Sequence, residues 1–151
     1  MLDIKFVREN PEIVKQNIRN KFQDQKLPLV DEVISLDSRI RELKNKGGEL
    51  RAERNSVSTS IGQMMREKKI EEANKAKQRV VEINTQLESI EKEEEQLNEE
   101  LTKRMLIIPN IIDKSVPIGK DDSENVEIQR FGEPKLKDFE IPYHLDILEA
   151  L

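Results

Sequence analysis

Residues 33–64, VISLDSRIRELKNKGGELRAERNSVSTSIGQM, decide the fold of this chain. Positions spaced alternately three and four residues apart form an unbroken series, and most of them carry apolar side chains. That spacing is the heptad repeat of a coiled coil, sustained here for more than four heptads. Gly47 and Arg54 break the apolar rule, and Gly48 weakens the helix further. The series consists of Val33, Leu36, Ile40, Leu43, Gly47, Leu50, Arg54, Val57, Ile61 and Met64.

A second series with the same spacing follows, and the two series match in a fold-back register. When a chain turns back on itself, the numbers of facing residues have a constant sum. Val57 and Val80 have the sum 137, and every other member of one series finds a partner with that sum. The pattern predicts a long antiparallel helical hairpin that turns between Lys68 and Lys69. The second series consists of Ala73, Ala76, Val80, Ile83, Leu87, Ile90, Glu94, Leu97, Leu101 and Arg104.

Two short helices with a break between them are expected before the hairpin. Asn10 is a good helix N-cap, and Pro11 suits the first helical position. The helical spacing of the next apolar residues predicts one buried face, made of Ile13, Val14, Ile18 and Phe22. Residues 23–28, QDQKLP, are expected to form a polar connector that ends at Pro28.

The sequence pattern changes after the predicted hairpin. Pro109 disfavours helical geometry in the residue before it, so the second long helix should end near Ile107. We therefore expect a helical domain over residues 1–108, and a linker with the start of a further domain over residues 109–151. Within that linker, NVEIQRF alternates as a short strand does, FGEP is typical of a turn, and the last residues begin an amphipathic helix. That helix would present Leu145, Leu148 and Leu151 on one face, with nothing in the sequence to pack on, as in a fragment of a longer protein.

The composition excludes several classes of protein. Charged residues make up 38% of the chain and aromatic residues 3%, against about 25% charged residues in a typical domain. Such a chain can bury a narrow apolar seam but not a thick core. There is no cysteine, which excludes disulfide frameworks and thiolate metal sites. No stretch approaches the roughly 18 apolar residues of a membrane span, and the amino terminus lacks a signal-peptide run, so we expect a soluble, cytoplasmic protein.

The sequence contains no recognisable catalytic or metal-binding constellation. The single histidine, His144, has no second histidine or cysteine to share a metal with. GKDDSEN, residues 119–125, includes a Gly-Lys pair but lacks the upstream glycine and the following helix of a phosphate loop. Its acidic residues do not have the spacing of a calcium loop. We expect no catalytic, cofactor-binding or metal-binding residue in this chain.

Charge is distributed unevenly along the predicted hairpin. Residues 51–86 hold eight basic and five acidic side chains, whereas residues 88–100 hold seven acidic and one basic. A basic outer half with an acidic inner segment favours contact with a phosphate backbone, and the shortage of aromatic residues disfavours base stacking. Recognition of a folded RNA by shape fits this pattern. The basic candidates for such contact are Lys68, Lys69, Lys75 and Arg79. A coiled-coil spacer or a protein-interaction hairpin without RNA binding is the alternative.

Three stretches in this order resemble the amino-terminal region of the bacterial-type seryl-tRNA synthetase family. They are MLDIKFVRENPEIV at residues 1–14, LRAERNSVSTSIG at residues 50–62, and the run from IPN at residues 108–110 through SVPIGKDDSENVEIQRFGEP at residues 115–134. The resemblance covers nearly the whole chain. This sequence departs from the family pattern in RFGEP, where a tryptophan is usual before the glycine, and in IIDKSVP and HLDIL, which match loosely.

The resemblance implies a tRNA-binding arm that precedes a class II synthetase catalytic domain. The arm would recognise the long variable arm and elbow of serine tRNA by shape, without reading the anticodon and without binding DNA or a membrane. The full-length enzyme would be a homodimer through its catalytic domains and would join serine to the tRNA using ATP and magnesium. The chain of 151 residues would lack the catalytic domain and be inactive alone. The polar residues that match the family's arm motif, and are therefore candidates for RNA contact, are Arg51, Arg54, Asn55 and Ser58.

Overall fold

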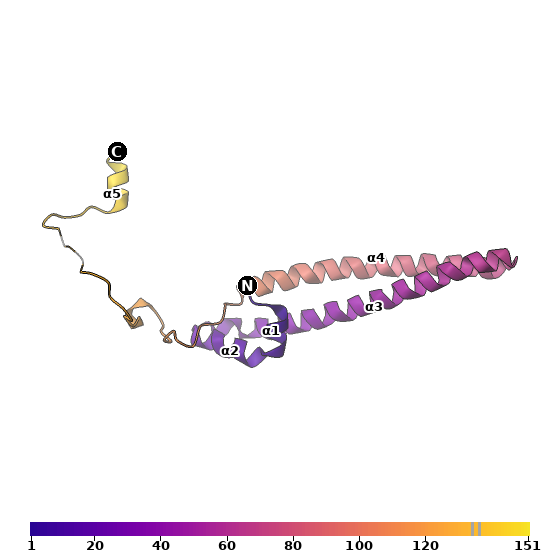
Figure 1. Ribbon diagram of the computed structural model, residues 1–151, viewed down its shortest axis with the longest axis horizontal. Helices are drawn as coiled ribbons and strands as arrows, with labels where there is room; N and C mark the ends of the chain where they lie inside the picture. The colour runs from indigo at the N-terminus through magenta and orange to yellow at the C-terminus, as the bar shows by residue number, and fades with distance from the viewer. Residues whose placement is uncertain (134, 136) are drawn as a thin grey trace. The chain divides into compact units, whose positions relative to one another are not determined.

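The computed structural model describes residues 1–133, 135 and 137–151. The chain divides into two compact units, residues 1–120 and residues 121–151. Its described residues form α-helices and short 3-10 turns, and no strand is found among them. Two long helices dominate the first unit, α3 at Leu27–Arg66 and α4 at Ile70–Ile107, and Figure 1 shows them running side by side in opposite directions. The predicted mainly α fold class and antiparallel hairpin are confirmed.

The seam between α3 and α4 follows the heptad register. Every position of both series is buried or half-buried. A Cβ built on Gly47 would lie 3.8 Å from Cγ2 of Ile90, and these two residues are partners in the constant-sum register. Ile83 is fully buried near the middle of the hairpin. Five side chains form the core of this seam, and they are Leu43, Leu50, Ile83, Leu87 and Ile90.

The turn of the hairpin lies where the register places it. Helix α3 ends at Arg66 and α4 begins at Ile70. The amide of Lys69 donates to the carbonyl of Met64 at 2.9 Å, and the amide of Lys68 donates to the carbonyl of Met65 at 3.3 Å. These two bonds define a Schellman motif, whose second-last position is left-handed and is usually glycine. Here that position is Lys68, with a φ of 60°.

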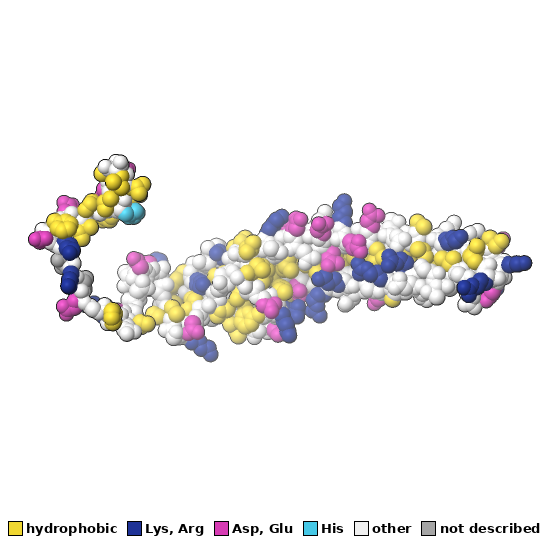
Figure 2. All heavy atoms as spheres, turned by 45° about the horizontal axis from the view of Figure 1, so that its top comes forward, with side chains coloured by type: hydrophobic (Ala, Val, Ile, Leu, Met, Phe, Trp, Pro, Cys, Tyr) yellow, Lys and Arg dark blue, Asp and Glu magenta, His cyan; other side chains and the backbone are white. Residues whose placement is uncertain are grey.

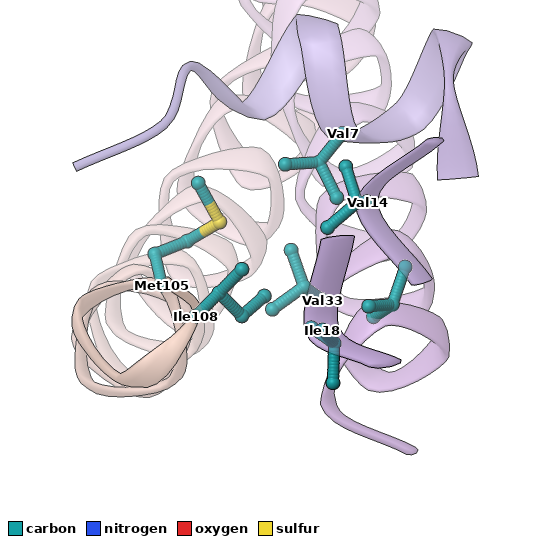
Figure 3. Close-up of a cluster of buried hydrophobic side chains, with 7 residues drawn as sticks. Val7, Val14, Ile18, Val33, Met105 and Ile108 are labelled. Carbon is teal, nitrogen blue, oxygen red and sulfur yellow. The ribbon is translucent and has the colours of Figure 1, made fainter. Parts of the chain in front are cut away.

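A compact cluster closes the open end of the hairpin. Helices α1 at Ile4–Glu9 and α2 at Pro11–Asn20, followed by the 3-10 turn η1 at Asp24–Lys26, lie beside α3. This confirms the expected pair of short helices. Figure 3 shows side chains from α1, α2 and the ends of both long helices pointing toward one another. The buried members of this cluster are Val7, Val14, Ile18, Val30, Val33, Met105 and Ile108.

Two buried polar side chains make contacts that stabilise the open end of the hairpin, which we call its base. Arg8 of α1 donates to a carboxylate oxygen of Asp37 on α3 at 2.8 Å, and Asp37 is buried. The side chain of Asn17 on α2, also buried, donates to the carbonyl of Asn110 at 3.1 Å and accepts from the amide of Ile112 at 2.8 Å. The backbone that follows α4 is therefore fixed to α2. This attachment falls beyond residue 108, where the sequence suggests a boundary, and that boundary stays a prediction.

Two local expectations before the hairpin are wrong, and a third is confirmed. Asn10 is the N-cap residue of α2 and Pro11 is its first residue, as expected. The side chain of Asn10 makes no capping hydrogen bond, because it donates to the carbonyl of Phe6 at 3.2 Å. Phe22 lies beyond the end of α2 with a φ of 53° and is 56% exposed, while Ile13 is 51% exposed. The polar connector is also shorter than expected, because α3 already includes Pro28 in its first turn. Proline is tolerated there since the first amides of a helix have no partner within the helix.

The second unit contains little regular structure in its described residues. The 3-10 turn η2 spans Asp122–Glu124, and α5 spans His144–Glu149. The strand expected for NVEIQRF, residues 125–131, is absent, since those residues are described and form none. An alternating pattern makes a strand only when a neighbouring strand pairs with its backbone, and the described residues supply no such neighbour. The expected final helix is present as α5, but it ends at Glu149, so Leu151 lies beyond it. Leu145, Leu148 and Leu151 are all exposed. The turn expected for FGEP includes residue 134, which lies outside the described residues.

Candidate nucleic-acid interface

Basic side chains occupy the outer half of the hairpin. Figure 2 shows Lys and Arg side chains over this part of α3 and α4 and at the turn end. Residues 51–86 carry a net charge of +3, and residues 88–100 on α4 carry −6. A polyanion would therefore be attracted to the outer half and repelled from the acidic segment nearer the base.

The hairpin has two flanks, which its ion pairs distinguish. Arg51 of α3 pairs with Glu91 of α4 at 2.8 Å, and their numbers have the sum 142. Glu53 of α3 pairs with Arg79 of α4 at 2.7 Å, with the sum 132. Core partners have the sum 137, so these two pairs lie on opposite sides of the seam. We name the two sides the Arg51 flank and the Arg79 flank.

The four residues of the arm motif gather on the Arg51 flank. Arg51, Asn55 and Ser58 are spaced by four and three residues, which places them along one side of α3. All three are exposed. Arg54 is half-buried in the seam, and its Nη1 lies 3.4 Å from Oδ1 of Asn84. The structure therefore brings together the four candidates that the family resemblance implies.

Gly47 makes room for the guanidinium of Arg51. A Cβ on Gly47 would stand 3.2 Å from Nη1 of Arg51 and 3.9 Å from its Cζ. With no side chain there, the guanidinium lies over the helix backbone and reaches Glu91. The adjacent Gly48 has nothing within 4 Å of its Cβ position. Only the first of the two glycines therefore has a packing role in this part of the helix.

Arg79 lies on the other flank and is held by two carboxylates. Its Nε and Nη2 donate to Glu53 at 2.7 and 3.2 Å, and its Nη1 donates to Glu82 at 3.2 Å. These hydrogen bonds raise the pKa of Arg79, and the same contact lowers the pKa of Glu53. The structure thus separates Arg79 from the four residues of the arm motif.

The three lysine candidates lie at or near the turn. Lys69 pairs with Glu67 at 2.7 Å, and this hydrogen bond raises the pKa of Lys69 and lowers that of Glu67. Lys68 and Lys75 are exposed, and neither forms an ion pair within the described part of the chain. Those two charges are therefore available to an anionic partner.

Two residues of α4 belong to the Arg51 flank but were not among the sequence-based candidates. Lys77 and Asn84 precede Glu91 by fourteen and seven residues, so all three share one heptad position. Both are exposed, and Lys77 makes no ion pair with any described residue. The constant-sum register could have located them, since it fixes which positions of α4 flank Arg51.

Other kinds of site find little support in the described residues. They include no group of three or more His, Cys, Asp or Glu side chains that could hold a metal ion. No helix among them is long and apolar enough to cross a membrane. A groove of about 400 Å³ lies on the Arg79 flank, nearer the base, and is lined mainly by polar and charged side chains. The charged outer hairpin is therefore the strongest candidate site.

Comparison with known proteins assigns the long two-helix arm to a family. The model of the seryl-tRNA synthetase N-terminal domain matches residues 1–112. The chain belongs to the seryl-tRNA synthetase N-terminal domain family.

Among its relatives, the serine–tRNA ligase of Methanocella arvoryzae is 42% identical over 144 residues, covering 95% of this chain and 33% of that protein. The serine–tRNA ligase of Pseudothermotoga lettingae is 38% identical over 151 residues, covering 100% of this chain and 35% of that protein. The chain thus spans about a third of the length of these curated relatives and matches their amino-terminal region.

Solved structures agree with the fold. The seryl-tRNA synthetase of Pyrococcus horikoshii, complexed with ATP, superposes with a TM-score of 0.78 at 36% identity, over 87% of this chain and 29% of that one. The cytoplasmic serine–tRNA ligase of Naegleria fowleri, in complex with AMP, gives a TM-score of 0.70 at 24% identity, over 89% of this chain and 36% of that one.

Proposed function

We propose that this chain is the tRNA-binding arm of a serine–tRNA ligase, and that it recognises serine tRNA by the shape and backbone of its long variable arm and elbow. One observation carries the proposal. The family's arm motif falls on the basic outer half of the hairpin, whose net charge of +3 contrasts with −6 on the acidic segment of α4. A phosphate backbone is attracted to the first and repelled by the second.

The candidate contact residues are those of the arm motif together with four cations of the outer hairpin. They combine guanidinium and ammonium groups, which suit phosphate oxygens, with short polar side chains. The described hairpin offers no aromatic platform for base stacking, so contact with the backbone and the shape of a folded RNA fits best. The eight candidates are Arg51, Arg54, Asn55, Ser58, Lys68, Lys69, Lys75 and Arg79.

The full-length protein is proposed to attach serine to its tRNA with ATP and magnesium, and to form a homodimer through catalytic domains. The described residues do not fit ATP and magnesium, because they hold no cluster of metal ligands and the sequence has no glycine-rich phosphate loop. We therefore assign that chemistry to the remainder of a full-length enzyme and derive no catalytic step from this chain. Charging of tRNA for translation would place the protein in the cytoplasm.

Binding of the 151-residue chain to two tRNA transcripts tests the proposal. One transcript has a long variable arm and the other a short one, and the expected result is tighter binding to the first. The logarithm of affinity should fall with the logarithm of salt concentration, by about 0.9 for each duplex phosphate neutralised. Equal, weak binding to both transcripts would contradict recognition by shape and would favour the spacer or protein-interaction hairpin.

A further inference from the structure

We propose that the RNA lies along the Arg51 flank of the hairpin, where Lys77 and Asn84 of α4 join the motif residues of α3, and that the Arg79 flank faces away from it. This inference rests on the proposed function. It goes further, because it assigns two new contact residues and a side to the interface, and it removes Arg79 from the eight candidates named above.

One row of residues on α3 forms part of the Arg51 flank. Arg51, Asn55, Ser58 and Gly62 follow one another at spacings of four, three and four residues, so they form a single row on the Arg51 flank. Nothing lies within 4 Å of a Cβ built on Gly62. The row thus runs from a guanidinium, through short polar groups, to open backbone. A bulky helical RNA can approach such a surface closely.

The surface of α4 that faces the same way completes the Arg51 flank. Glu91 belongs to the Arg51 flank because it pairs with Arg51 at 2.8 Å. Asn84 and Lys77 lie one and two heptads before it, on the same side of α4. Arg54 from the seam also extends toward Asn84, with 3.4 Å between Nη1 and Oδ1. Donor groups from both helices therefore converge along one side of the hairpin.

Two arginines of the other flank are each paired with two carboxylates, whereas Arg51 is paired with one. Arg79 donates to both Glu53 and Glu82. Arg39, also on that flank, pairs with Glu93 at 2.8 Å and with Glu42 at 3.5 Å. A phosphate approaching either arginine meets two carboxylates beside it. The free positive charge of Lys77, on the Arg51 flank, has no such competitor among the described residues.

The absence of cysteine from the chain allows a direct test with single thiols. Ser58 lies one heptad after Arg51, and Ser60 lies one heptad after Glu53, so the two serines lie on opposite flanks. Ser58 is exposed and Ser60 is half-buried. We would prepare Ser58→Cys and Ser60→Cys, attach an iron chelate that generates hydroxyl radicals, and map cleavage of a bound serine-tRNA transcript with a long variable arm. Mass spectrometry would confirm equal labelling.

The expected result is strong, localised cleavage from position 58 and weak cleavage from position 60. Equal cleavage from both positions, or stronger cleavage from position 60, would overturn the assignment of the flank. Failure of the unmodified chain to bind any tRNA would instead remove the proposed function, and this inference with it.

A charge test gives an independent readout. Lys77→Gln should weaken binding and reduce the slope of log affinity against log salt by about one, as expected for one lost phosphate contact. Lys46→Gln is the control, since Lys46 lines the groove on the Arg79 flank. It should leave the slope unchanged. Equal slopes for the parent chain and Lys77→Gln would overturn the role of Lys77. Circular dichroism of both variants would establish that the hairpin is intact.

Discussion

The guanidinium of Arg51 lies over Gly47, with Nη1 only 3.2 Å from the place where a Cβ would stand. A glycine inside a helix destabilises it by about 1 kcal/mol relative to alanine. In return, Arg51 reaches Glu91 of the facing helix without a clash. Gly47 and Arg51 therefore act together, because the missing side chain of the glycine lets the guanidinium of the arginine lie on the Arg51 flank.

Replacement of each glycine by alanine separates the two roles. Gly48→Ala should raise the free energy of unfolding by about 0.5–1 kcal/mol, because its Cβ position is open and only helix propensity changes. Gly47→Ala should gain less, since the new methyl group must displace the guanidinium of Arg51. Urea denaturation followed by circular dichroism measures both. Equal gains in unfolding free energy would show that the guanidinium of Arg51 moves aside without a free-energy cost.

Glu91 would compete for Arg51 with an RNA bound along the proposed Arg51 flank, so it should weaken binding. Glu91→Gln is expected to raise affinity for the long-armed transcript by about twofold, equivalent to the roughly 0.4 kcal/mol of an exposed ion pair. Glu88→Gln makes the same change of charge at a residue that has no ion pair among the described residues. It should raise affinity less. Equal effects of the two variants would reduce the role of Glu91 to general repulsion.

The Glu53–Arg79 pair predicts a pH dependence of hairpin stability. Arg79 lowers the pKa of Glu53 below its ordinary value of 4.5. The pair therefore contributes its full stability above that value, and the contribution is lost as pH falls through the lowered pKa. Thermal melts should show the parent chain more stable than Glu53→Gln at neutral pH, with a difference that shrinks below about pH 4. A difference that grows in acid would contradict this.

Lys68 adopts a left-handed conformation that a lysine reaches at a cost. Lys68→Gly should raise the melting temperature of the hairpin, because glycine removes a strain of about 1 kcal/mol at this position of the turn. Lys69→Gly is the control. Lys69 has a φ of −83° and pairs with Glu67, so its replacement should give no gain. Failure of Lys68→Gly to stabilise the chain would mean that the turn relaxes around the lysine.

Asn17 attaches the backbone after α4 to α2. Asn17→Ala should lower the free energy of unfolding by about 1–3 kcal/mol, since it leaves the carbonyl of Asn110 and the amide of Ile112 without their partner. Hydrogen exchange at the Ile112 amide should accelerate as well. Asn20→Ala removes only an exposed bond with Gln16, so it should change stability by less than about 0.5 kcal/mol. Unchanged exchange at Ile112 would show that another group holds this segment.

Much of the hairpin could be predicted from the sequence because its determinants are local and periodic. The heptad spacing predicts both helices, the constant sum predicts the turn between Lys68 and Lys69, and Pro109 predicts the end of α4 near Ile107. The errors concern features that depend on distant or backbone-specific contacts. Phe22 continues the apolar spacing of α2, but it lies after the end of that helix and has a left-handed backbone conformation.

The candidate site was predictable in its location along the hairpin but not around it. Runs of charge identify the outer half without reference to the fold. Whether a cation is free depends on its neighbour across the seam, and Arg79 meets Glu53 from 26 residues away. Lys75 and Lys77 carry the same charge in the sequence, and only the pairing register of the two helices places Lys77 on the Arg51 flank. A search for opposite charges at positions whose residue numbers have the sum 132 or 142 would have identified the two flanks.

The constant-sum register also couples the lengths of the two helices. One residue inserted into α3 alone would shift every later layer by about 100° around the helix axis and expose the seam. Seven residues added to α3 and seven added at the facing positions of α4 would keep every existing layer and carry the turn about 10 Å farther from the base. The hairpin therefore keeps all of its existing layers when it is lengthened by paired heptads. A change in the length of the hairpin must therefore match, in steps of one heptad, the size of the partner that binds along it.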